Sequence, residues 1–142
     1  MSSVSEVNES NWEKEILKHE TVVIVDFWDS QCHWCKVLEP VYAEIASEYS
    51  GKVKFAKIQV SENPEIAKKY GVWGTPTLVI FCGGRQVGSI TGFRPKEGLI
   101  SLVEEIAFKY RECAISSTEV KVQEPTAEEN QSWIHKIKKV FR

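Results

Sequence analysis

Two uninterrupted apolar segments constrain the fold of this chain more than any other feature. The segment TVVIVDFW occupies residues 21–28, and the segment TLVIF occupies residues 77–81. Continuous apolar runs of this length, bounded by polar residues, are typical of β-strands that are covered on both faces. Strands of this kind need helices above and below the sheet, so the sequence predicts an α/β domain.

Helical and turn signals stand between and around these strands. Apolar residues recur at helical spacing from His33 to about Tyr49, and again after Pro95. A capping box formed by Ser10 and Glu13 predicts a short helix near the N-terminus, in which Trp12, Ile16 and Leu17 form the buried side.

Further signals complete the predicted order of elements. Residues 52–60 are expected to form a second strand, and Asn63-Pro64 to start a short helix with Asn63 as its N-cap. Gly83-Gly84 predicts a hairpin turn into a strand at residues 86–90. The expected architecture is a central mixed β-sheet flanked by helices on both faces.

Composition narrows the function classes. The chain has 142 residues, 42% of them hydrophobic, and a formal net charge of −2, so it can build a core and lacks the basic excess of a nucleic-acid binder. We find neither a signal-peptide pattern nor a membrane-spanning run, and we therefore expect a cytoplasmic protein. Thiols are normally kept reduced in that compartment, so a CxxC pair there is more often catalytic or metal-binding than structural.

The chain contains such a pair, Cys32 and Cys35, directly after the first apolar strand. A metal site at this spacing usually needs a second cysteine pair or nearby histidines, whereas Cys82 and Cys113 stand singly. At the start of a helix, Cys32 would face unpaired backbone N–H groups and the positive end of the helix dipole, which stabilise a thiolate. These features favour a redox pair, with no metal and no bound cofactor.

Several motifs in order extend this interpretation. VDFWDSQCHWCK, KIQVSENPEIAKKYGVWGTPTLVIF with its Gly74-Thr75-Pro76-Thr77, Gly83-Gly84 and Gly92-Phe93 together resemble the thioredoxin family over about residues 8–110. The resemblance implies a thioredoxin fold for a domain spanning residues 1–111, and thiol–disulfide oxidoreductase activity. It implies that Cys32 attacks a substrate disulfide and that Cys35 resolves the mixed disulfide.

The resemblance also assigns roles to residues around the pair. Burial of Asp26 within an apolar strand should raise its pKa, and the resemblance makes Asp26 the acceptor of the Cys35 proton, with Lys57 as its partner. It implies a cis-Pro76 loop facing the cysteines, in which the backbone of Thr75 pairs with extended substrate. Gly74 and Gly92 would lie beside that groove, and Trp28 would pack beneath the site and shield it.

The active-site segment departs from the family pattern. The family commonly has Gly-Pro between the cysteines and a tryptophan before the first, where this chain has His33-Trp34 and Gln31. We expect His33 and Trp34 to tune the site: His33 could stabilise the Cys32 thiolate, which would make the protein more oxidising, or could be solvated without an electrostatic role. Trp34 adds apolar surface beside the thiols.

The remaining segments stay outside the resemblance. Cys82 is expected to be a small buried hydrophobe, and Cys113 an exposed thiol capable of intermolecular disulfides. Residues 112–142 are expected to form a linker and an amphipathic basic C-terminal helix. That helix, residues 127–142, could pack on its own chain or a second copy, on a partner protein, or on a membrane surface.

The leading hypothesis is an enzyme that reduces or exchanges protein disulfides and is itself reduced by an NADPH- or ferredoxin-linked thioredoxin reductase. The alternative is a binding module that keeps the fold and uses the cis-Pro76 groove to hold partner proteins. Retention of both cysteines, Asp26 and Pro76 argues for the enzyme.

Overall fold

The computed structural model describes residues 3–113, which form a five-stranded sheet and its helices. The strand order is β1-β3-β2-β4-β5. β1, β3 and β2 are parallel, whereas β4 runs antiparallel to both β2 and β5. The strands are β1 (Val4–Val7), β2 (Val23–Trp28), β3 (Lys54–Gln59), β4 (Thr77–Cys82) and β5 (Arg85–Thr91). The predicted mixed sheet is confirmed.

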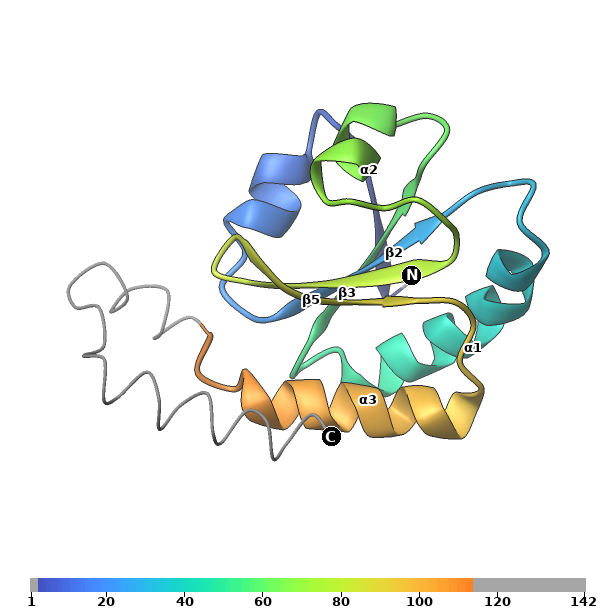
Figure 1. The fold of residues 1–142 in the computed structure, drawn as a ribbon. Helices are drawn as coiled ribbons and strands as arrows, with labels where there is room; N and C mark the ends of the chain where they lie inside the picture. The colour runs from blue at the N-terminus through green and yellow to red at the C-terminus, as the bar shows by residue number, and fades with distance from the viewer. Residues whose placement is uncertain (1–2, 114–142) are drawn as a thin grey trace, which may run out of the picture.

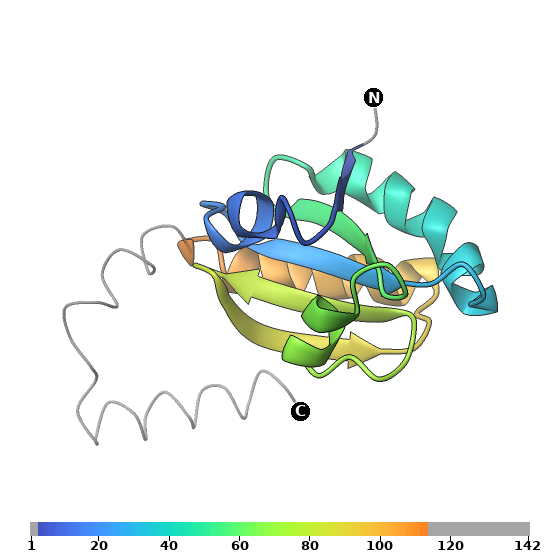
Figure 2. The same ribbon diagram turned by 90° about the horizontal axis from the view of Figure 1, so that it is seen from above.

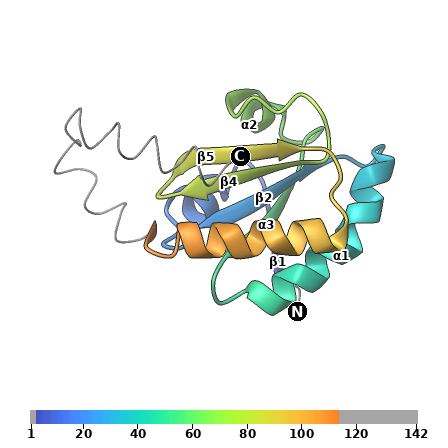
Figure 3. The same cartoon turned by 60° about the horizontal axis from the view of Figure 1, so that its bottom comes forward.

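Helices cover both faces of this sheet, also as predicted. α1 (His33–Tyr49) and α3 (Lys96–Lys109) lie on one face, and the π-helical turn η1 (Glu13–Leu17) and α2 (Pro64–Lys69) lie on the other (Figure 1; Figure 3). The view from above shows η1 and α2 in front of the sheet and α3 behind it (Figure 2). Each face therefore has its own apolar core.

The two apolar segments account for the centre of the sheet. In both β2 and β4 the first five residues are buried, and the two strands are neighbours. Their alternate side chains enter opposite cores: Ile24 and Leu78 pack against α1 and α3, whereas Val25 and Val79 pack against η1 and α2. The continuous apolar pattern reflects this burial on both faces.

The N-terminal segment differs from the prediction in two respects. Residues 4–7 form an edge strand that the sequence did not reveal, and the capping box of Ser10 and Glu13 does not form. Instead, Asn8 Oδ1 accepts hydrogen bonds from the backbone N–H groups of Ser10 and Asn11, at 2.9 and 3.2 Å. Asn8 rather than Ser10 thus organises the turn before η1, because its side-chain oxygen accepts these two hydrogen bonds.

Asn63 is a further correction. It precedes α2 and Pro64 is the first residue of that helix, as predicted, but the Asn63 side chain does not cap it. Its Oδ1 accepts from the Glu9 backbone N–H at 3.0 Å, and its Nδ2 donates to the Gln59 carbonyl at 2.9 Å. Asn63 is buried and ties the loop after β1 to the end of β3.

The prediction of an exposed Cys113 thiol is wrong, and Cys82, which is partly buried against the core as expected, is its disulfide partner. The two cysteines form a disulfide with a Cα–Cα separation of 5.6 Å, and Cys113 is buried rather than exposed. The topology explains the pairing. β4 ends at the end of the sheet opposite the active-site loops, and α3 runs back toward that same end. The bond therefore joins the end of β4 to the segment just after α3.

Loss of this disulfide is expected to destabilise the oxidised protein by about 3 kcal/mol, because it constrains a long loop in the unfolded chain. The two cysteines that close this loop are 31 residues apart in the sequence. The measurement is urea denaturation of wild type and Cys113→Ala. The difference in stability should disappear in excess dithiothreitol, because Cys82 and Cys113 of the wild type are then thiols in both the folded and the unfolded chain. Equal stability of the two oxidised proteins would contradict the crosslink.

Within residues 3–113, no helix combines the length and the apolar character needed to cross a bilayer. The C-terminal helical extension predicted for residues 112–142 lies outside the described residues, apart from Glu112 and Cys113.

Candidate active site

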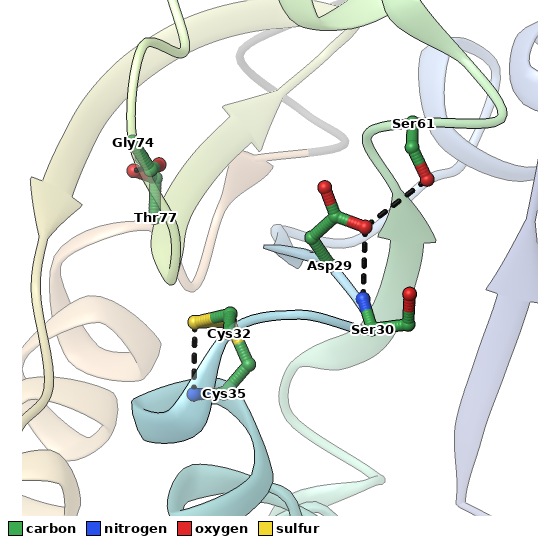
Figure 4. Close-up of a disulfide and its surroundings, with 7 residues drawn as sticks. All are labelled: Asp29, Ser30, Cys32, Cys35, Ser61, Gly74 and Thr77. Atoms are coloured by element: carbon green, nitrogen blue, oxygen red, sulfur yellow. Dashed lines mark hydrogen bonds between the residues drawn. A yellow bond between two sulfur atoms is a disulfide. The ribbon is translucent and has the colours of Figure 1, made fainter.

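The cysteine pair lies where the sheet and α1 meet. β2 ends at Trp28, a short loop follows, and Cys32 occupies the N-cap of α1 with an extended backbone at φ −95° and ψ 112°. Cys32 Sγ accepts a hydrogen bond from the Cys35 backbone N–H at 3.1 Å (Figure 4). The sulfur therefore caps the helix at its positive end, which is where a thiolate gains most stabilisation.

Cys32 and Cys35 form a disulfide with a Cα–Cα separation of 5.3 Å. The two sulfurs have different surroundings, since Cys35 is buried and Cys32 is half-buried. An outside disulfide can therefore reach Cys32 more readily than Cys35. This asymmetry suits one attacking and one resolving thiol.

The loop before β4 faces the disulfide. The Thr75–Pro76 peptide is cis, as the resemblance implied. Thr77 Oγ1 donates to the Gly74 carbonyl at 2.6 Å, and the Gly92 N–H donates to the Pro76 carbonyl at 2.8 Å. Gly92 has a φ of 100°, which favours glycine at this position. Figure 4 shows Gly74 and Thr77 across from Cys32.

A cavity of about 310 Å³ lies behind the disulfide, and Asp26, Cys35 and Lys57 all line it. Asp26 is only 4% exposed, and its Oδ1 has no hydrogen-bond partner in the described protein. Burial raises the pKa of Asp26 from 3.8 to about 7, although the charge of Lys57 opposes this shift. A carboxyl with such a pKa can both accept and release a proton near neutral pH.

Lys57 and Trp28 form the rest of the predicted inner site. Lys57 lies opposite Asp26 in the register of β3 and β2, and its Nζ lies 5.7 Å from the centre of the Trp28 ring. Trp28 lines the same cavity, and its buried Nε1 has no partner in the described protein. The cavity is large enough for water, which can donate to Asp26 and accept from Trp28.

The two residues between the cysteines point to the surface. His33 is exposed, and its ring meets the Trp34 ring edge-to-face with centroids 5.2 Å apart. Trp34 is 53% exposed and also contacts Phe93, with ring centroids 5.2 Å apart. Within residues 3–113, no hydrogen bond joins His33 to Cys32. Tuning of the site by His33 therefore stays a prediction.

Sequence reasoning missed two residues at this site. Trp73, directly before Gly74, is a large apolar side chain that is 92% exposed. Glu39 lines the cavity behind the disulfide. Its position four residues after Cys35 was the available signal, since residues at this spacing share a helix face.

In the part of the chain that the structure describes, no cluster of three or more histidine, cysteine or acidic side chains could hold a metal ion. Cys32 and Cys35 are bonded to each other, and Cys35 lines the cavity. The fold and the site together define a protein of the dithiol–disulfide class, with one half-buried and one buried cysteine at a helix start.

Comparisons with known proteins identify the family. The family model described as Thioredoxin matches residues 3–105. This chain belongs to the thioredoxin family. Thiol–disulfide exchange with protein substrates, followed by re-reduction by a reductase, is the general chemistry of that family, and Cys32 and Cys35 supply the cysteine pair for it.

The similar proteins include bacterial and plant members. Thioredoxin 1 of Nostoc sp. is 40% identical over 105 residues, which cover 74% of this chain and 98% of that protein. Thioredoxin of Synechocystis sp. shows the same identity and the same coverage. The chloroplastic M-type thioredoxin of Brassica napus is 39% identical over 99 residues, which cover 70% of this chain and 56% of that protein.

Proposed function

We propose that this protein reduces or exchanges protein disulfides by a dithiol–disulfide mechanism with Cys32 as the nucleophile. The observation that carries the proposal is the Cys32–Cys35 disulfide at the start of α1, opposite the cis-Pro76 loop. A half-buried sulfur at a helix N-cap can attack, and a buried sulfur one turn later can resolve.

The first step joins the protein to its substrate. The Cys32 thiolate attacks one sulfur of a substrate disulfide, and the substrate S–S bond breaks as the Cys32–substrate mixed disulfide forms. The other substrate sulfur leaves as a thiolate and takes a proton from solvent. Thr75 is half-buried beside Gly74, and its backbone would pair with the extended substrate chain.

The second step releases the substrate. The Cys35 thiol gives its proton to the Asp26 carboxylate through cavity water, and the Cys35 thiolate attacks Cys32 Sγ. The mixed disulfide breaks, the second substrate sulfur leaves as a thiolate and takes a proton from solvent, and Cys32–Cys35 is oxidised. The substrate has then gained two electrons and two protons, which a reductase or an external dithiol must restore to the protein.

We further propose that exposed aromatic side chains contact the substrate. Trp34 stacks on Phe93 beside the disulfide, and Trp73 adjoins the Gly74–Pro76 loop. Large aromatic residues commonly provide the contact area at recognition surfaces. His33 and Trp34 would in this way affect both the choice of substrate and the reduction potential.

The electron donor and the location are also proposals. A thioredoxin reductase, linked either to NADPH or to ferredoxin, is the proposed donor, and no bound cofactor is required in this chain. The cytoplasmic location predicted from the sequence remains a proposal, and chloroplastic relatives make the plastid the other compartment to examine.

The test is reduction of insulin disulfides by the full chain with dithiothreitol as the electron source. We expect catalytic precipitation of the insulin B chain above the rate with dithiothreitol alone. A rate equal to that background would contradict the proposal. It would favour instead the binding module that holds partners in the cis-Pro76 groove.

A further inference from the structure

The cavity behind the disulfide contains a second carboxylate that the mechanism above does not use. Asp26 and Glu39 both line it, together with Cys35, Lys36 and Lys57. Asp26 comes from β2 and is buried, whereas Glu39 comes from the second turn of α1 and is exposed. The two carboxyl groups therefore bound the same cavity of about 310 Å³, Asp26 on its buried wall and Glu39 on a wall that reaches solvent.

The helix geometry explains why Glu39 lies there. Residues four apart in an α-helix share one face, so Glu39 follows Cys35 along the side of α1 that meets the cavity. Cys35 is buried and Glu39 is exposed, which means that this helix face passes from the protein interior to solvent over one turn. Lys36, which is also exposed and lies three residues before Glu39, lines the same cavity.

The proposed reaction needs a route for protons through this region. Each resolving step moves one proton from Cys35 to Asp26, and that proton must leave before the next cycle. Asp26 is 4% exposed, so its direct exchange with solvent is restricted. A carboxylate that shares the cavity and contacts solvent can pass the proton on through water.

We propose that Glu39 acts through Asp26, as a positioning residue that helps its proton to leave. Asp26 is then the inner and Glu39 the outer carboxylate of a proton route between Cys35 and solvent. The inference rests on the proposed function and deepens it. In each resolving step Asp26 receives the proton of Cys35, cavity water carries it outward, and Glu39 releases it to solvent. No oxidant or reductant beyond the substrate disulfide takes part.

The charges around Asp26 agree with this arrangement. Burial is the main cause of its raised pKa, Lys57 on β3 lowers the pKa, and Glu39 on α1 raises it. The other charged groups on the cavity wall are Asp29, in the loop after β2, and Lys36. On the β4 side, the residue paired with Asp26 is the apolar Leu78. Glu39 is thus a like charge that favours the protonated form of Asp26.

The experiment titrates Asp26 in the full chain by carboxyl ¹³C NMR in the disulfide form, in which Cys32 and Cys35 do not titrate. In Glu39→Gln the Asp26 midpoint should fall by roughly half a pH unit, because a like charge is removed. Glu39→Asp keeps the charge and should keep the midpoint closer to wild type. Glu48→Gln, which removes the same charge from an exposed site on the same helix, should leave it unchanged.

Kinetics give the second readout. The pH profile for release of the reduced substrate should shift to lower pH in Glu39→Gln by the same amount. Its plateau rate should also fall, because the outer carboxylate is gone, and added acetate should restore part of that rate. An unchanged Asp26 midpoint in Glu39→Gln, or an equal shift in Glu48→Gln, would overturn the inference. The NMR titration needs no turnover, so a wild type inactive on insulin would count against the proposed function alone.

Discussion

Replacement of Cys32 by serine is expected to reduce insulin reduction to the background rate, whereas Cys35→Ser should trap the substrate on the protein. The structure gives the reason, since Cys32 is the more accessible sulfur and caps α1, where a thiolate is stabilised. A serine hydroxyl at this position cannot attack a disulfide. In Cys35→Ser the attack still occurs, but no thiol is available to break the mixed disulfide.

Non-reducing mass spectrometry provides the measurement. Cys35→Ser should carry one covalently bound insulin chain per protein, removable by dithiothreitol, and Cys32→Ser should carry none. The matched control is the double variant Cys82→Ala, Cys113→Ala, which removes the other disulfide at the opposite edge of the sheet. It should keep near wild-type activity. Adducts on Cys32→Ser, or loss of activity only in the control, would contradict the prediction, because either result would assign the chemistry to Cys82 and Cys113.

Asp26→Asn is expected to stabilise the folded protein above pH 7 and to remove most of the pH dependence of its stability. Burial raises the pKa of Asp26 from 3.8 to about 7, so the folded state holds this proton more tightly than the unfolded state. As pH rises from about 4 to 7, the unfolded chain loses the proton first, and the free energy of unfolding falls. About three pKa units correspond to about 4 kcal/mol.

Urea denaturation between pH 4 and pH 9 tests this prediction. The wild-type free energy of unfolding should fall as pH rises to about 7 and then level off, whereas the Asp26→Asn value should stay nearly constant over the same window. Glu62→Gln, at an exposed position, should follow wild type. Parallel curves for wild type and Asp26→Asn would show that Asp26 has an ordinary pKa. The same variant should also slow resolution, since the proposed proton acceptor is gone.

The sequence was most informative where one residue type has one physical consequence. Continuous apolar runs must be buried on both faces, and this predicted that β2 and β4 are covered by helices above and below the sheet. A cysteine at a strand end and helix start must face the helix N-terminus, which placed Cys32. A carboxylate inside an apolar strand must be desolvated, and this gave the direction of the Asp26 pKa shift.

The sequence was least informative where partners come from distant segments. β1 has only four residues, and its ladder to β3 places Val4 and Val7 in the two apolar cores. The side chain of Asn63 bonds to Glu9 and Gln59 instead of its own helix. Cys82 and Cys113 stand 31 residues apart, and only the folded topology brings them together. Glu39 looks like an ordinary helix-surface residue until the cavity beside it is seen.

The Cys82–Cys113 bond also fixes the position of Cys113, the last residue that the structure describes. Cys113 is anchored beside the start of β2, since it lines the same pocket as Glu20 and Thr21, whereas Cys32 follows the end of that strand. Cys113 and the reactive sulfur of Cys32 are therefore separated by the full length of β2. The second disulfide stabilises the end of the domain that is remote from the substrate.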